Sequence, residues 1–258
     1  MSLEWALELA ERTRARLRGA PPSPPSQVFF SPAAAAGTDA GLAAYLDHTL
    51  LRVDATTVDI DTLADEAKRS GCAGACVHSR HIGRVARRLE GSKTLPIAVV
   101  GFPQGATLPR VKVFEARAAY EEGARELDVV ADLGAIRESA FDRALDELIQ
   151  VTSATPLSVK VIIETSLWSD AEKVQAAVVA ELAGAAFVKT STGFQGGGAT
   201  EQDIRLLRRV LAAHVRVKAS GGIRTAEQAW AMVRAGAHRV GTSSAPALVA
   251  GESIRGDY

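Results

Sequence analysis

Three lysines of this chain lie where a surface charge is not expected. Only seven of the thirty basic residues are lysines, and Lys160, Lys189 and Lys218 fall inside short apolar runs typical of buried strands. A lone buried ammonium is costly and tends to lose its proton. A neutral amine attacks carbonyl carbons and forms a Schiff base, whereas a guanidinium stays protonated and cannot. The three lysines therefore indicate carbonyl chemistry, with the alternative that each extends its ammonium to solvent.

Lys189 is the first candidate for the nucleophile. It follows the apolar residues 185–188 and precedes the glycine-rich segment 193–198, so it is expected near the carboxyl end of a buried strand. A second ammonium close by favours the neutral form of the first. Lys160 or Lys218 could supply that second charge.

The elements that must position these side chains begin near Leu42, where short apolar runs alternate with helical patterns. Eight strands each followed by a helix predict a (β/α)8 TIM barrel, for which ~250 residues is the usual length. A doubly wound open sheet is the alternative, although it usually has fewer repeats. The strands are expected at 44–48, 74–78, 97–102, 126–131, 158–164, 186–190, 215–219 and 239–241. The helices are expected near 57–70, 79–90, 107–122, 138–152, 169–183, 201–213, 225–235 and 244–250.

The carboxyl ends of the strands in such a barrel face one mouth, where the active site lies. Charged groups of both signs are expected to converge there, including Asp128 from the fourth strand. A structural ion-pair network would explain any one pair, but it does not explain why three of seven lysines gather. The residues expected to contact a substrate are Asp47, Thr49, Cys76, Lys160 and Thr190.

The segments after the seventh and eighth strands, 220–224 and 241–244, combine glycines with serines. Many barrels hold a phosphate on these two loops through backbone N–H groups and a helix N-terminus. A Gly-Gly pair alone could be only a tight turn. Both loops together, in these barrel positions, predict a phosphate site that includes Gly221, Gly222, Gly241, Ser243 and Ser244.

Composition excludes several other classes of function. Acidic and basic residues balance at thirty each, so neither nucleic acid nor an anionic membrane surface is expected as a partner. No apolar run reaches the ~18 residues of a membrane span, and no signal-peptide pattern is seen. Cys72 and Cys76 are interpreted as reduced thiols of a cytoplasmic protein. The histidines and cysteines form no metal-binding pattern, so neither a metal nor a cofactor is expected.

Residues 1–40 are predicted to form a separate extension of the barrel. Residues 3–18 have the pattern of an amphipathic helix, and the proline-rich residues 21–32 cannot continue it. The barrel and its C-terminal tail would then occupy residues 41–258.

Several strings of the chain resemble the deoxyribose-phosphate aldolases, a family of class I aldolases with a (β/α)8 barrel. The resemblance extends from about Tyr45 to Ser244, and residues 1–40 lie outside it. The strings, each from its first residue, are LDHTLL from Leu46, ACV from Ala75, VVGFP from Val99, ELDVV from Glu126, VKVIIET from Val159, VKTSTG from Val188, KASGGIR from Lys218 and GTSS from Gly241.

This resemblance implies reversible cleavage of 2-deoxy-D-ribose 5-phosphate to acetaldehyde and D-glyceraldehyde 3-phosphate. Lys189 would form the Schiff base, Lys218 would perturb Lys189 and assist proton transfer, and Asp128 would partner Lys218. The terminal Tyr258 would also assist proton transfer, and a homodimer or homotetramer would be common for the family. The resemblance places the phosphate on Gly193, Gly221, Gly222, Arg224, Ser243 and Ser244. Two alternatives remain open: a class I aldolase for another phosphorylated sugar, and a sugar-phosphate-binding barrel without catalysis.

Overall fold

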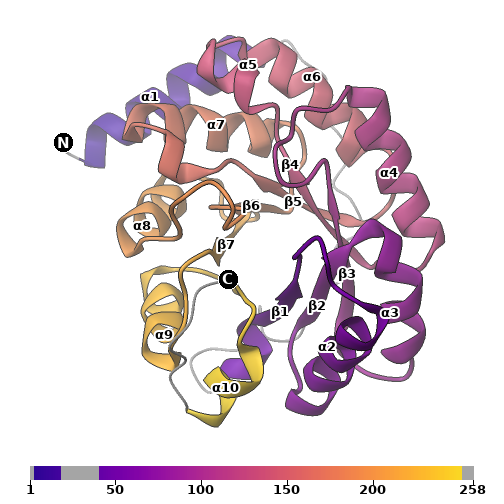
Figure 1. Ribbon diagram of the computed structural model, residues 1–258. Coiled ribbons are helices and arrows are strands. Elements are labelled where there is room, and N and C mark those ends of the chain that lie inside the picture. Colours follow the sequence, from indigo (N-terminus) through magenta and orange to yellow (C-terminus); the bar gives the residue numbers. More distant parts are fainter. Residues whose placement is uncertain (1–2, 19–40, 252–258) are drawn as a thin grey trace.

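The computed structural model describes residues 3–18 and 41–251, and its strands form a closed parallel barrel surrounded by helices (Figure 1). Each strand pairs with its neighbour in the chain, and the last strand pairs with the first. The predicted (β/α)8 barrel is confirmed, and the open-sheet alternative is wrong. The strands are β1 (Leu46–Leu50), β2 (Gly74–His78), β3 (Leu95–Val100), β4 (Glu126–Val130), β5 (Ser158–Ile162), β6 (Phe187–Lys189), β7 (Arg216–Ser220) and β8 (Arg239–Thr242).

Several helices on the outside begin after residues whose side chains satisfy free backbone N–H groups. The side chains of Thr56, Ser169 and Thr225 each accept a hydrogen bond from the backbone N–H three residues later. In each case the side chain of that later residue accepts a hydrogen bond from the backbone N–H of the first residue. The barrel helices are α2 (Thr57–Ser70), α3 (Ile82–Arg88), α4 (Pro109–Glu121), α5 (Leu133–Arg137), α6 (Phe141–Thr152), α7 (Asp170–Leu182), α8 (Glu201–Val210), α9 (Ala226–Ala235) and α10 (Ala245–Ala250).

Several predicted boundaries differ from the structure by a few residues, and two of these differences have identifiable reasons. The first strand was expected from residue 44, but Leu42–Tyr45 form a 3-10 turn and β1 begins afterwards. The helix expected at 138–152 begins at Phe141, and the short helix α5 precedes it. Ser139 separates the two helices with a φ of 56°. Asp132 starts α5 by accepting the backbone N–H of Ala135 at 2.9 Å. Five helical residues are too few to produce a visible hydrophobic period.

Most of the apolar core lies between the strands and the surrounding helices, as the alternation of side chains across each strand requires. The interior of the barrel is different. A small apolar group of Leu51, Cys76, Ile97 and Val99 packs near β2 and β3. The interior faces of β1, β4, β5, β6, β7 and β8 instead carry charged side chains, where barrels usually place apolar layers.

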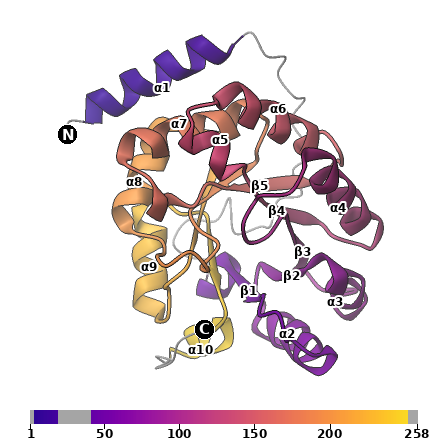
Figure 2. The ribbon, with the colours of Figure 1, turned by 45° about the horizontal axis from the view of Figure 1, so that its top comes forward.

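An additional helix, α1 (Leu3–Leu17), packs on the outside against α7 and α8 (Figures 1 and 2). Its buried side chains Ala6, Ala10 and Leu17 share one face, so the predicted amphipathic helix is confirmed. Arg14 forms an ion pair with Glu181 of α7 at 2.7 Å. The division of the chain at residue 40 stays a prediction, and the proline-rich segment lies outside the described residues.

Candidate active site

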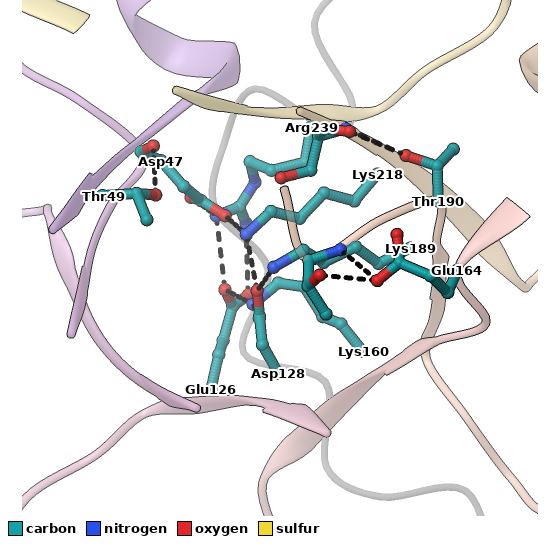
Figure 3. A network of polar contacts seen from close by, with 12 residues as sticks. Asp47, Thr49, Glu126, Asp128, Lys160, Glu164, Lys189, Thr190, Lys218 and Arg239 are labelled. Atoms are coloured by element: carbon teal, nitrogen blue, oxygen red, sulfur yellow. Dashed lines mark hydrogen bonds and ion pairs between the residues drawn. The ribbon is translucent and has the colours of Figure 1, made fainter. Parts of the chain in front are cut away.

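Asp128, in the middle of β4, is the centre of a cluster of charged side chains inside the barrel (Figure 3). Its Oδ1 accepts a hydrogen bond from Lys160 Nζ at 2.9 Å. Its Oδ2 accepts hydrogen bonds from Lys189 Nζ and Lys218 Nζ, each at 2.8 Å. Asp128, Lys160 and Lys218 are fully buried, and Lys189 is 2% exposed. The convergence of three amines and one carboxylate, expected from the sequence, is therefore present.

The register of the strands explains why these four side chains meet. Asp128 lies opposite Lys160 in the β4–β5 pair, and Lys189 lies opposite Lys218 in the β6–β7 pair. Because residues in register share a face of the sheet, each pair points the same way. Closure of the barrel then turns both faces toward one interior.

Glu126 and Arg239, which were not expected at the site, extend the cluster. Arg239 donates to Asp47 Oδ1 at 2.5 Å and forms an ion pair with Glu126 Oε1 at 3.1 Å. Glu126 also pairs with Lys160 at 2.7 Å, and Asp47 pairs with Lys218 at 2.6 Å. Glu126 could have been inferred from the sequence, because it lies two residues before Asp128 and therefore on the same face of the strand.

Four members of the cluster are held in their charged forms. Burial alone would raise the pKa of Asp128, but the ammonium groups of Lys160 and Lys218 and the hydrogen bond from Lys189 outweigh burial and hold it well below its usual range. Burial also opposes the charge of Asp47, yet Arg239 and Lys218 lower its pKa to about 2. Burial would lower the pKa of Lys218 and of Arg239, but the adjoining carboxylates raise both above their ordinary values. All four are therefore ionised at neutral pH.

Lys189 differs from the other two amines in its number of anionic partners. Lys160 pairs with Glu126 and Asp128, and Lys218 pairs with Asp47 and Asp128. Among the described residues, Lys189 pairs only with Asp128. It is also the last residue of β6. In the described part of the chain, Lys189 therefore has one carboxylate partner, where Lys160 and Lys218 each have two.

The residues expected to contact a substrate lie around this cluster. Cys76 is buried, which raises the pKa of its thiol to about 11 with a further contribution from Asp128, so the thiol is neutral. Thr49 Oγ1 donates to the carbonyl oxygen of Asp47 at 3.0 Å. Thr190 Oγ1 donates to the carbonyl oxygen of Ser220 at 3.1 Å, which joins β6 to β7. Contact of these groups with a substrate stays a prediction.

The loops after β6, β7 and β8 are linked to one another. Gly193, Gly221 and Gly222 have φ values of 87°, 88° and 75°, in the left-handed region that favours glycine. A Cβ on Gly198 would lie 2.3 Å from the carbonyl oxygen of Gly221, so the loop after β6 packs closely on the loop after β7. Thr242, the last residue of β8, donates to the carbonyl oxygen of Ile223 at 3.0 Å.

The other residues expected to bind phosphate lie at helix starts, with one exception. Arg224 directly precedes the N-cap residue of α9, and Ser243 and Ser244 directly precede α10. Gly241 instead lies within β8, where an added Cβ would be 2.8 Å from Ser220 Oγ and 3.2 Å from Lys218 Cε. Its missing side chain therefore leaves room for these two side chains, a reason for glycine that is separate from phosphate binding.

One further buried lysine and one expected residue lie apart from the cluster. Lys112 of α4 is fully buried and pairs with Glu147 of α6 at 2.7 Å. Its Nζ also donates to the carbonyl oxygen of Val130 at 2.9 Å, so this amine has an anionic partner and a structural position. Tyr258 lies outside the described residues, and its role stays a prediction.

Comparisons with known proteins bear on the chemistry of this cluster. The family model described as DeoC/LacD family aldolase matches residues 42–253. A deoxyribose-phosphate aldolase of Thermococcus gammatolerans is 47% identical over 216 residues, which cover 81% of this chain and 96% of the relative. That of Macrococcus caseolyticus is 42% identical and covers 84% of this chain and 99% of the relative. The tetrameric deoxyribose phosphate aldolase of Aeropyrum pernix superimposes with a TM-score of 0.73 at 31% identity, covering 94% of this chain and 95% of that structure.

Proposed function

This chain belongs to the DeoC/LacD aldolase family, and from that premise we propose that it reversibly cleaves 2-deoxy-D-ribose 5-phosphate to acetaldehyde and D-glyceraldehyde 3-phosphate. The observation that carries the proposal is the convergence of Lys160, Lys189 and Lys218 on the buried Asp128. A barrel that only binds a sugar phosphate has no need of three buried amines on one carboxylate.

The reaction begins with Lys189 as nucleophile. Its neutral amine adds to the aldehyde carbon C1 of the open-chain sugar, and loss of water from the resulting carbinolamine gives a protonated Schiff base. The positive nitrogen then serves as the electron sink for the next step. Lys189 suits this role because it is the amine with one carboxylate partner and the one at a strand end.

Carbon–carbon cleavage follows on the Schiff base. The hydroxyl on C3 gives up its proton, the C2–C3 bond breaks, and its electron pair moves toward the iminium nitrogen to give an enamine. D-Glyceraldehyde 3-phosphate leaves, C2 of the enamine takes a proton, and water releases acetaldehyde from Lys189. We assign the proton transfers to Asp128 and Lys218, whose direct hydrogen bond of 2.8 Å joins an acid and a base inside the site.

The phosphate of the sugar would lie against the loops after β6, β7 and β8. Their glycines allow close approach of a ligand to the backbone, whose N–H groups are suited to phosphate oxygens. Arg224, Ser243 and Ser244 would add a positive charge and two hydroxyl donors. This placement leaves the aldehyde end of the sugar directed toward Lys189.

We also propose that the enzyme acts in deoxyribonucleotide breakdown in the cytoplasm, as a homodimer or homotetramer. Both cysteines are free and buried, which suits a reducing compartment. Within the described residues, no helix combines the length and the apolar character needed to cross a membrane. The solved relative from Aeropyrum pernix is a tetramer, which supports self-association.

Trapping of the covalent intermediate tests the proposed reaction. Incubation with 2-deoxy-D-ribose 5-phosphate followed by borohydride reduction is expected to leave a two-carbon adduct on Lys189, located by peptide mass spectrometry. Cleavage is measured separately by the acetaldehyde released. An adduct on Lys160 or Lys218 would overturn the residue roles, and no adduct with no cleavage would overturn the substrate.

The close contact of two loops provides a test of the phosphate site. Gly198→Ala should raise the KM for the sugar phosphate about 10- to 100-fold, because the new methyl group separates the loop from Gly221 and charge-assisted hydrogen bonds of ~1.5–3 kcal/mol are lost. Gly41→Ala is the matched control, since nothing lies within 4 Å of its added Cβ. An unchanged KM in Gly198→Ala would contradict phosphate binding at these loops.

A further inference from the structure

Six charged side chains inside the barrel form a closed ring in which positive and negative groups alternate (Figure 3). In order around the ring they are Asp128, Lys218, Asp47, Arg239, Glu126 and Lys160. The successive N···O distances are 2.8, 2.6, 2.5, 3.1, 2.7 and 2.9 Å, the last of which returns to Asp128. Three cations and three anions give this ring a net charge of zero.

Lys189 is hydrogen-bonded to the ring through Asp128 but is not a member of it. Its Nζ contacts Asp128 Oδ2, an oxygen that Lys218 already shares. A protonated Lys189 therefore adds one positive charge that no further carboxylate in the ring balances. A neutral Lys189 leaves the buried cluster uncharged, which is the cheaper state away from water.

Two further ionisable side chains near the cluster, Cys76 and Glu164, are not part of the ring. Cys76 on β2 is a neutral thiol because burial raises its pKa to about 11. Glu164, which follows β5, accepts hydrogen bonds from the backbone N–H of Thr192 at 3.0 Å and from its hydroxyl. Among the described residues Glu164 forms no ion pair with an amine of the cluster. The charged groups facing Lys189 from the other strands are Asp47 on β1, Glu126 and Asp128 on β4, Lys160 on β5, Lys218 on β7 and Arg239 on β8.

We propose that Arg239 is a positioning residue that makes Lys189, rather than Lys160 or Lys218, the neutral amine of the site. Arg239 closes the ring by pairing with Asp47 and Glu126, which in turn pair with Lys218 and Lys160. Its guanidinium carbon also lies 5.7 Å from the centre of the Phe187 ring, a further contact that keeps it inside the barrel. Arg239 touches no reacting atom in this scheme. The inference rests on the proposed function for the role of Lys189.

Opposite changes of charge in the ring should move the pH dependence of the reaction in opposite directions. Arg239→Met removes a cation, so the ammonium form of Lys189 becomes more favourable. The acidic limb, where kcat/KM falls as the pH is lowered, should therefore move to higher pH by about one unit. Glu126→Gln removes an anion, so the same limb should move downward by a comparable amount. A pH profile of kcat/KM for each variant measures both shifts.

Two further variants separate charge from structure. Arg239→Lys keeps the positive charge and should retain the acidic limb of the parent enzyme. The double variant Arg239→Met with Glu126→Gln removes one charge of each sign, so its limb should return toward that of the parent. A purely structural role for Arg239 would lower the rate at every pH and move neither limb. That result, or a shift of both single variants in one direction, would overturn the proposal.

Labelling of the parent protein tests the same inference without turnover or variants. Acetaldehyde and borohydride, applied from pH 6 to 9, should modify Lys189 and leave Lys160 and Lys218 unmodified, as located by peptide mass spectrometry. Comparable labelling of Lys160 or Lys218 would overturn the role of the ring. Selective labelling of Lys189 without cleavage of deoxyribose 5-phosphate would overturn the proposed substrate and leave the role of the ring intact.

Discussion

Lys189→Arg should abolish turnover, with kcat lowered by at least about 10⁴-fold, because the covalent nucleophile is lost. The substitution keeps N–H donors near Asp128, so the loss cannot be attributed to a missing hydrogen bond to that carboxylate. A guanidinium stays protonated and cannot add to a carbonyl carbon. The measurement is the release of acetaldehyde from deoxyribose 5-phosphate at saturating substrate.

Lys173→Arg is the matched control for this substitution. Lys173 lies on α7 and pairs with Asp170 and Asp203, away from the barrel interior. This variant should turn over at the rate of the parent, and both variants should show the same circular dichroism. Retention of more than a trace of activity in Lys189→Arg would refute the Schiff-base role.

Asp128→Asn should reduce both the activity and the stability of the protein. Its carboxylate is the common partner of Lys160, Lys189 and Lys218, and an amide cannot balance their charges. Breaking a buried ion pair by removing one partner typically costs about 3–5 kcal/mol. Loss of general acid–base catalysis should lower kcat by about 10²- to 10⁴-fold.

Glu147→Gln distinguishes these two effects. Glu147 is also a buried carboxylate paired with a lysine, but its partner is Lys112 on the outside of the barrel. Urea unfolding should show a loss of stability in both variants, whereas kcat should fall only in Asp128→Asn. Equal losses of kcat in the two variants would mean that Asp128 acts through stability alone.

The features of the fold that depend on local patterns can be predicted from the sequence. Apolar runs separated by capping residues located all eight strands, and the second strand was predicted at the residues observed, Gly74–His78. The gathering of Lys160, Lys189, Lys218 and Asp128 in one place also followed, because a parallel barrel places equivalent strand positions at one level.

The closure of the charge ring could not be predicted because it depends on contacts between distant parts of the chain. Arg239 was assigned only to the start of a strand, a position where an arginine usually extends to solvent. Its inward direction follows from the register of β8, in which it lies opposite Lys218. Its pairing with Asp47 joins residues 192 positions apart. The spacing of apolar residues within one strand or helix gives no information about a contact at such a separation.

The two ion pairs of Asp47 join the first strand to the last two, and this order has a consequence during synthesis. A chain emerging from the ribosome contains Asp128 and Lys189 well before it contains Arg239. Until β8 docks beside β1, the ring is open and its charges have no fixed balance. On the proposed role of Arg239, the nucleophile would therefore gain its full electrostatic environment only when the last strand completes the barrel.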